Sequence, residues 1–160
     1  MAIGSTAMCD SFKVDILSGG HNFNTTNRAL TLNTQDIFKI ALFTSTSVIS
    51  NTTATYGAAT NEVASGGGYT TGGLATPGGW QVTQVPSNGG SSNTVAYINF
   101  SNPQWTAATF AADGALIYNN TNAGRTVAVL NFGGTKTVSS GTFTIQMPTA
   151  GTGSSILQIA

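Results

Sequence analysis

Charge is the scarcest property of this chain of 160 residues. Lys, Arg, Asp and Glu make up 6% of it, where about 25% is usual in a globular domain. Five basic side chains balance five acidic ones, so the formal net charge is zero. Nucleic-acid binding relies on clustered Lys and Arg, and docking on anionic lipid relies on basic segments. The sequence therefore predicts neither a nucleic-acid partner nor a membrane partner.

Reactive side chains are scarce as well. Cys9 is the single cysteine, which excludes an internal disulfide and favours a small buried hydrophobe. His21 is the single histidine, so a closed zinc site with four N or S ligands is not expected. No G-x-S-x-G elbow occurs, and Gly133–Thr137 lacks the spacing of a phosphate-binding loop. We predict no catalytic residue, no cofactor and no metal, and therefore no enzyme.

Long apolar runs are absent too. No run reaches the roughly 18 residues of a membrane helix, and residues 1–8 lack the features of a signal peptide. A chain of this length is expected to form one domain that buries about 70% of its unfolded surface. With so little charge, we expect copies of the chain or a partner to cover much of that surface. The alternative is a Thr, Ser and Asn surface that stays soluble unaided.

The chain does contain apolar runs of strand length, separated by polar connections rich in Gly and Asn. In Asp36–Thr44 apolar residues fall on both faces of a strand, which predicts a central or doubly covered strand. About eight strands at spacings of roughly 8–15 residues predict an all-β fold, an antiparallel two-sheet β-sandwich of jelly-roll or Ig-like type. The other expected strands are Trp80–Val85, Val95–Phe100, Trp105–Phe110, a run to Tyr118 after an Asp113–Gly114 turn, Val127–Phe132, Thr142–Met147 and Ile156–Ala160, with short edge strands near Glu62–Ala64 and Leu74–Ala75.

The strand faces also predict a core. Truncating Phe143 to alanine is expected to cost about 3–5 kcal/mol if its ring is central. The side chains expected to be mostly buried are Phe38, Ile40, Leu42, Leu116, Val129, Phe132, Phe143 and Ile145.

One short helix is expected before the sandwich, over Asp10–Ser18. Phe12, Ile16 and Leu17 fall on one side of it, and Gly19–Gly20 follows as a stop. So short a helix cannot stand alone, so its apolar face must dock on the sheet or on a neighbouring subunit. We expect a helix and arm over residues 1–35 and the sandwich domain over residues 36–160.

Few polar or aromatic residues point to a site. His21 is expected beside the helix end, Glu62 as a loop charge, and Asp36 and Arg125 each in a pair. Tyr69, Trp80 and Trp105 suit either a carbohydrate site or, the favoured interpretation, a core or interface. The segment Ser45–Gly79, which contains the loop Ser65–Gly73, suits a short edge strand or an exposed contact loop. The predicted interface residues are Phe12, Ile16, Leu17, Phe23, Tyr69 and Trp80.

Several segments also resemble a family of small structural proteins of tailed bacteriophages. They are Cys9–Lys13, His21–Phe23, Asp36–Thr44, Thr60–Val63, Gly68–Gly73, Gly114–Tyr118, Ala128–Phe132 and Gly141–Pro148. The resemblance covers nearly the whole chain and consists of β-structure patterns. It implies a virion component made in the cytoplasm of a bacterial host, namely a capsid decoration or cement protein. Such a protein binds the major capsid protein at the capsid surface, and a tail or head-fibre adhesin is the alternative.

The composition is compatible with that role. Many copies on a lattice need only weak individual contacts, and uncharged contacts vary little with salt. Symmetry favours a closed homo-oligomer, a trimer or a dimer. We expect residues 1–35 to reach the capsid or a neighbour, so deleting residues 1–20 should release the protein from capsids without unfolding it.

Overall fold

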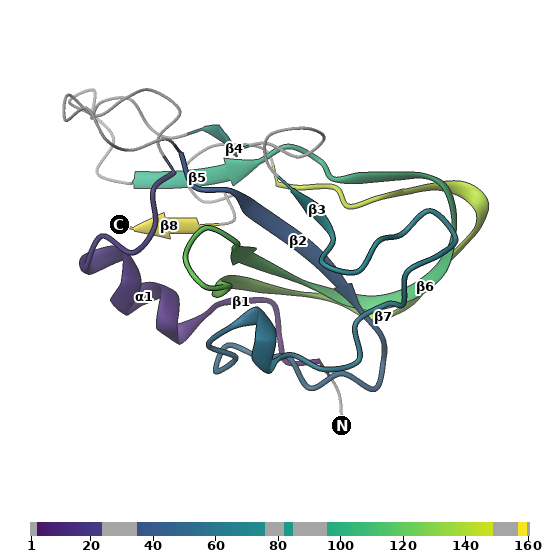
Figure 1. The fold of residues 1–160 in the computed structure, drawn as a ribbon, viewed down its shortest axis with the longest axis horizontal. Coiled ribbons are helices and arrows are strands. Elements are labelled where there is room, and N and C mark those ends of the chain that lie inside the picture. The colour runs from purple at the N-terminus through teal and green to yellow at the C-terminus, as the bar shows by residue number, and fades with distance from the viewer. Residues whose placement is uncertain (1–2, 24–34, 76–81, 85–95, 149–156, 160) are drawn as a thin grey trace.

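The computed structural model describes residues 3–23, 35–75, 82–84, 96–148 and 157–159. In this part of the chain the structure is mostly antiparallel β-strand with one short α-helix, which confirms the expected class (Figure 1). The elements are β1 (Ala7–Met8), α1 (Asp10–Leu17), β2 (Phe38–Phe43), a 3-10 turn (Tyr56–Ala58), β3 (Leu74–Ala75), β4 (Val82–Gln84), β5 (Ala96–Phe100), β6 (Gln104–Asn119), β7 (Arg125–Thr144) and β8 (Leu157–Ile159).

The described strands form two antiparallel sheets. One has five strands in the order β1-β7-β6-β2-β3, and the other has three in the order β4-β5-β8. The expected strands at Asp36–Thr44, Val95–Phe100 and Leu74–Ala75 are present as β2, β5 and β3. The strand expected over Trp80–Val85 is present as β4, which pairs with β5.

The fold is dominated by one long hairpin of β6 and β7, which have 16 and 20 residues. This corrects two sequence expectations, because the chain does not turn at Asp113–Gly114, and residues 127–132 and 142–144 belong to one strand. Gly114 lies within β6, at a position where the neighbouring chain leaves no room for a side chain. A Cβ on it would lie 2.5 Å from the Leu130 carbonyl oxygen and 2.8 Å from Ile3 Cδ1.

The hairpin bends partway along its length. Positive φ angles occur in β7 at Gly133, Gly134 and Ser140 and in β6 at Ala107, and the pairing register slips at several points nearby. Figure 1 shows the two strands curving together at the end of the molecule away from α1. We call residues 114–131 the inner half of the hairpin, and residues 104–113 with 132–144 the outer half.

The core lies around β2 and the inner half of the hairpin. Leu116 and Val129 are fully buried as expected, as are the apolar residues of β2 at Phe38, Ile40 and Leu42. Phe132, Phe143 and Ile145 also pack against the core as expected, but they are less completely buried. Phe132 and Phe143 lie on the outer half and Ile145 directly follows it, where the chain covers less of each strand.

The N-terminal helix packs on the chain's own sheet. The Phe12 ring is 2% exposed and meets Phe23 edge-on at 6.0 Å, and Phe23 stacks on Phe38 at 4.3 Å. Cys9 is fully buried as expected, and burial raises the pKa of its thiol. Deleting residues 1–20 would remove Ile3, Cys9 and Phe12 from the core. The expectation that this deletion leaves the fold intact is therefore corrected.

The glycine-rich loop after Glu62 closes over the outer half of β6. The Thr109 amide donates to the Gly67 carbonyl, and a Cβ on Gly67 would lie 2.2 Å from the Thr109 carbonyl oxygen. Glycine is required there because the two backbones touch. None of the helices in the described residues is both long and apolar enough to span a bilayer.

Candidate functional site

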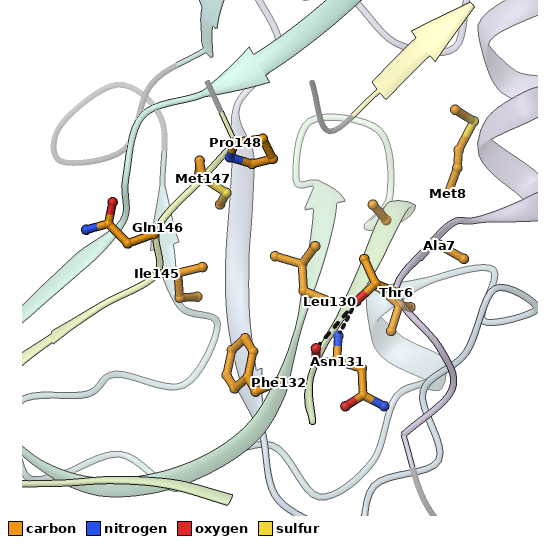
Figure 2. Close-up of a pocket in the computed structure, with 12 residues that line it drawn as sticks. Thr6, Ala7, Met8, Leu130, Asn131, Phe132, Ile145, Gln146, Met147 and Pro148 are labelled. Atoms are coloured by element: carbon orange, nitrogen blue, oxygen red, sulfur yellow. Dashed lines mark hydrogen bonds between the residues drawn. The ribbon is translucent and has the colours of Figure 1, made fainter. Parts of the chain in front are cut away.

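An open groove runs along β7, between its inner half and the chain that follows its outer half (Figure 2). Its larger hollow has a volume of about 530 Å³. Leu130 and Phe132 form the floor, the segment Thr6–Met8 forms one wall and the segment Ile145–Pro148 forms the other. The groove exists because the bend brings Ile145–Pro148 back over the inner half of the same strand.

A second hollow of about 500 Å³ continues the first one along the outer half. It shares Phe132 and Ile145 with the first hollow and extends past Lys136 to Val138 and Phe143. We call the two hollows together the β7 groove. Among the described residues that line the groove, Lys136 alone carries a charge. Apart from the buried Ala128 and Val129, its apolar side chains are partly exposed, so they remain accessible to a partner.

The backbone edge of β7 that faces away from β6 borders this groove. The strand β1 covers that edge at Ala128 and Val129, and the Thr6 hydroxyl bonds the backbone N–H and C=O of Asn131. From Gly133 to Thr144, no strand of the described residues pairs on that side. An open edge beside apolar side chains can pair with an extended segment and hold its side chains. The arrangement is therefore suited to contact with another chain.

Most of the residues that the sequence assigns to an interface lie elsewhere. Phe12, Phe23 and Tyr69 are at most 5% exposed within the chain's own core, which corrects their assignment to a contact surface. Ile16 is partly buried against that core, and Leu17 is 89% exposed. Sequence cannot separate a core aromatic from an interface aromatic, because both lie on apolar faces. Trp80 lies outside the described residues.

The sequence missed the groove residues because it assigned them to the core. The alternation over Thr142–Met147 identifies the apolar face of a strand, but no pattern says how completely that face is covered. Trp105, which suits a carbohydrate site by sequence together with Tyr69, is 3% exposed and packs against the Tyr69 ring at 6.1 Å. The favoured interpretation of these two aromatics as core residues is confirmed.

Glu62 anchors the loop over β6 rather than standing as a loop charge. Its carboxylate accepts hydrogen bonds from the Tyr69 hydroxyl and the Gly72 amide, both at 2.6 Å, and from the Tyr56 hydroxyl. The Leu42 amide donates to the Tyr69 hydroxyl at 2.9 Å, which ties the loop to β2. Burial and the neighbouring Glu62 carboxylate raise the pKa of Tyr56 and of Tyr69 well above 10.

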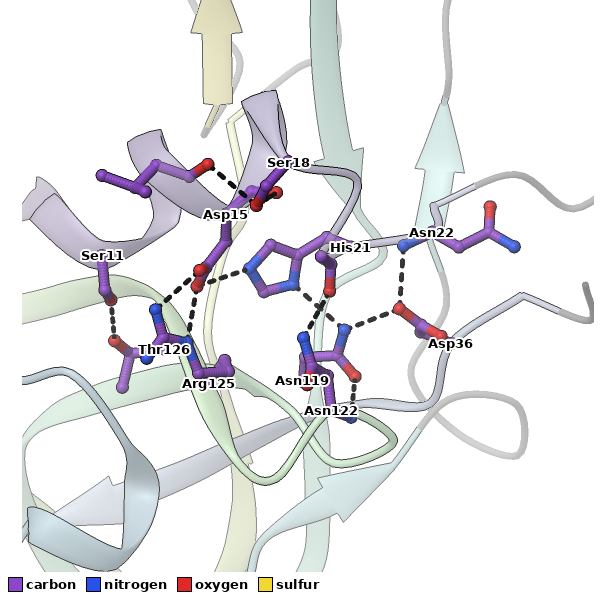
Figure 3. Close-up of polar contacts among 12 residues, drawn as sticks. Ser11, Asp15, Ser18, His21, Asn22, Asp36, Asn119, Asn122, Arg125 and Thr126 are labelled. Carbon is purple, nitrogen blue, oxygen red and sulfur yellow. Dashed lines mark hydrogen bonds and ion pairs between the residues drawn. The ribbon is translucent and has the colours of Figure 1, made fainter.

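A polar cluster joins α1 to the turn between β6 and β7 (Figure 3). Arg125 donates two hydrogen bonds to the Asp15 carboxylate, at 2.6 and 2.7 Å, across 110 residues of sequence. These bonds hold the pKa of Asp15 below its usual value. Asp36 accepts bonds from the Asn22 amide at 2.8 Å and from Asn119 Nδ2 at 2.7 Å. The expected partners of Arg125 and Asp36 are thereby identified.

His21 lies in the same cluster, beside the helix end as expected. Its side chain is fully buried, 5.0 Å from the Phe12 ring. No group of three or more His, Cys, Asp or Glu side chains in the described residues could hold a metal ion. The acidic side chains Asp10, Asp15, Asp36, Glu62 and Asp113 each accept a hydrogen bond within the fold.

Comparison with known proteins adds no relative. No protein-family model matches this chain, and neither a curated protein nor a solved structure matches it.

Proposed function

We propose that this chain is a structural protein of a bacteriophage virion, a capsid decoration protein that binds the major capsid protein lattice and stabilises the head. The observation that carries the proposal is the open, apolar and almost uncharged β7 groove on a neutral β scaffold. The segments that resemble small phage structural proteins support the same role. The carboxylates are used inside the fold, which suits a chain whose function is contact.

The groove has the properties that attachment to a lattice requires. Its apolar side chains and its open strand edge supply binding energy, and the near absence of charge keeps that energy insensitive to salt. Many weak contacts on one particle add up to stable attachment, above all if the chain forms a dimer or trimer. In this proposal the two sheets pack as a sandwich of jelly-roll or Ig-like type, and β7 supplies the edge that faces the partner.

The alternative is a tail or head-fibre adhesin. That role would use exposed aromatic side chains to stack on sugar rings. Tyr69 and Trp105 are buried, so these two aromatics do not favour it. We therefore place the decoration role first, at the surface of the virion head.

Copy number per particle tests the proposal. Purified virions of the phage that encodes this chain are separated on a gel, and the stained band is compared with that of the major capsid protein. A decoration protein should approach the capsid protein in amount, within about a factor of three. A few copies per particle would instead support the fibre role, and absence from the virion would overturn the proposal.

The groove itself is tested with particles from a phage strain that lacks the chain. Purified wild-type chain and the variants Ile145→Asp and Met147→Asp are added, and bound protein is measured after sedimentation. We expect each aspartate to reduce binding at least tenfold, because a charge would have to lose its water in an apolar contact. Leu17→Asp is the control, since Leu17 is 89% exposed on α1. Loss of binding in the control alone would move the contact to the helix.

A further inference from the structure

His21 has a buried ring with two different nitrogen environments. Its Nδ1 lies 3.0 Å from Asn119 Nδ2, within hydrogen-bond distance. Its Nε2 faces Asp15 Oδ2 at 3.6 Å, which is too long for a hydrogen bond, and no other atom of the described residues bonds it. Figure 3 shows the ring between the Asp15 carboxylate and the Asn119 amide.

The orientation of the Asn119 amide decides the state of the ring. Its Oδ1 accepts the backbone N–H groups of Thr121 and Asn122, both at 3.0 Å. Its Nδ2 donates to Asp36 Oδ2 at 2.7 Å. Rotating the amide by 180° would lose both backbone bonds and set its oxygen against the Asp36 carboxylate. The nitrogen therefore has to face His21, so Nδ1 must be the acceptor.

A neutral ring with an accepting Nδ1 carries its proton on Nε2, facing Asp15. A second proton on Nδ1 would point at the amide hydrogens of Asn119 and break that contact. The cation would also lack water, because the side chain is fully buried.

The charged groups around the ring shift the pKa of His21 in opposite directions. Asp15 on α1 and Asp36 ahead of β2 favour the cation, whereas Arg125 on β7 disfavours it. The Asp15 charge is already engaged by Arg125, and the Asp36 charge by Asn22 and Asn119. Phe12, Phe23 and Phe38 fill the remaining sides with rings. Burial outweighs the carboxylates and lowers the pKa of His21 below 6.5.

We propose that His21, Asn119 and Asp15 form an acid-sensitive latch, which joins residues 10–23 to the β6–β7 turn and opens when His21 takes up a second ring proton from solvent. The helix α1 has eight residues, too few to persist without its packing. Opening the latch would therefore loosen the helix as well as the contact. The device is independent of the proposed virion role.

The direction of the pH effect follows from proton linkage. The unfolded chain binds a proton at His21 near pH 6.5, and the folded chain binds it only at lower pH. Between those values the unfolded state holds more protons, so stability falls as the pH falls. One proton changes the folding equilibrium constant by at most about tenfold per pH unit.

The wild-type chain provides the first test, since His21 is the single histidine. Ring nitrogen shifts are followed by NMR from pH 8 to pH 4.5, together with amide exchange of residues 10–17. We expect the Nε2–H tautomer at pH 7, a midpoint below 6.5, and loss of helix protection at that same midpoint. A midpoint at or above 6.5, the other tautomer, or unchanged helix protection through the midpoint would each overturn the latch.

The variant His21→Phe provides the second test because it keeps an aromatic ring and removes the titrating group. Unfolding is measured in denaturant between pH 6.5 and pH 5. We expect the folding equilibrium constant of the wild type to fall as the pH is lowered. The folding equilibrium constant of the variant should remain unchanged in this window. Equal slopes for the two proteins would contradict the proposal. If the variant does not fold, the NMR titration of the wild type decides alone.

Discussion

The inner and outer halves of the β6–β7 hairpin share two strands and one pairing pattern, yet they differ in environment. In the inner half every residue from Gly114 to Asn119 is buried, and so is every residue from Thr126 to Val129. In the outer half Trp105, Ala108 and Ala112 are buried, while Phe110, Phe132 and Phe143 keep part of their surface. The elements β2 and α1 pack on the inner half, which reaches the β7 groove only at Ala128–Asn131. The outer half lines the groove at Phe132, Lys136–Val138 and Thr142–Thr144.

The two halves pair in the same antiparallel way, so pairing alone does not determine the role of a strand. The inner half consists of continuous apolar runs, Ala115–Tyr118 and Val127–Leu130, as expected of strands that are covered on both faces. The outer half mixes apolar residues with Thr, Ser and Gly. Distant segments cover the inner half on both faces and leave part of the outer half free for contact. Substitutions confined to one half at a time test this difference.

The largest expected effect belongs to the inner half. Leu116→Ala should lower the free energy of unfolding by about 3–4 kcal/mol, because the side chain is fully buried. Phe143→Ala should cost about 1–2 kcal/mol, less than the sequence predicts, since the ring is half-buried. Chemical denaturation of both variants measures this. Equal losses would show that the two halves are equally packed.

The next effect concerns the loop that bridges the two halves. Tyr118 of the inner half donates its hydroxyl hydrogen to the Gly72 carbonyl at 2.8 Å, and the Tyr69 ring meets Trp105 and Phe110 of the outer half. Glu62→Gln should cost about 1–3 kcal/mol, because a charged acceptor of three hydrogen bonds is lost. Amide exchange should rise more at Thr106–Thr109 than at Leu116–Tyr118. A uniform rise over both segments would argue against a bridging loop.

Replacing a glycine of positive φ at the bend between the halves should lower the stability of the fold. Gly134 has a φ of +132° and no atom within 4 Å of an added Cβ. Gly134→Ala should therefore cost about 1–2 kcal/mol through backbone strain without a clash. Gly57→Ala is the matched control, because it also meets no atom and its φ is not positive. We expect it to stay within about 0.5 kcal/mol of the wild type in thermal and chemical unfolding.

The smallest effect concerns the ion pair between α1 and the inner half. Asp15→Asn should cost about 1 kcal/mol, because Arg125 is one-third exposed and solvent weakens the pair. The pKa of Asp15 is lowered in the fold, so its contribution is present above about pH 4 and is lost as the pH falls further. Unfolding measured from pH 5 to pH 2.5 should show a shallower acid loss in the variant. An identical acid profile would contradict the assignment.

Sequence predicts the parts of this fold that local pattern determines. Alternation locates β2 and helical spacing locates α1, with errors of one or two residues at the ends. Glycine misleads at Gly114, because a residue that permits close strand packing resembles a turn residue.

The candidate site is harder to predict, because its parts are distant in the chain. The Arg125–Asp15 pair joins residues 110 positions apart, and the groove unites Thr6–Met8 with Ile145–Pro148. Sequence identifies Phe143 and Ile145 as apolar but cannot say whether anything covers them.

The most direct test of the account is amide hydrogen exchange of the chain free and bound to phage particles. We expect new protection along residues 132–147 on the particle, at the open edge of β7, with little change at Leu116–Asn119, which is already buried. Unchanged exchange at residues 132–147 on saturated particles would contradict a contact role for the groove.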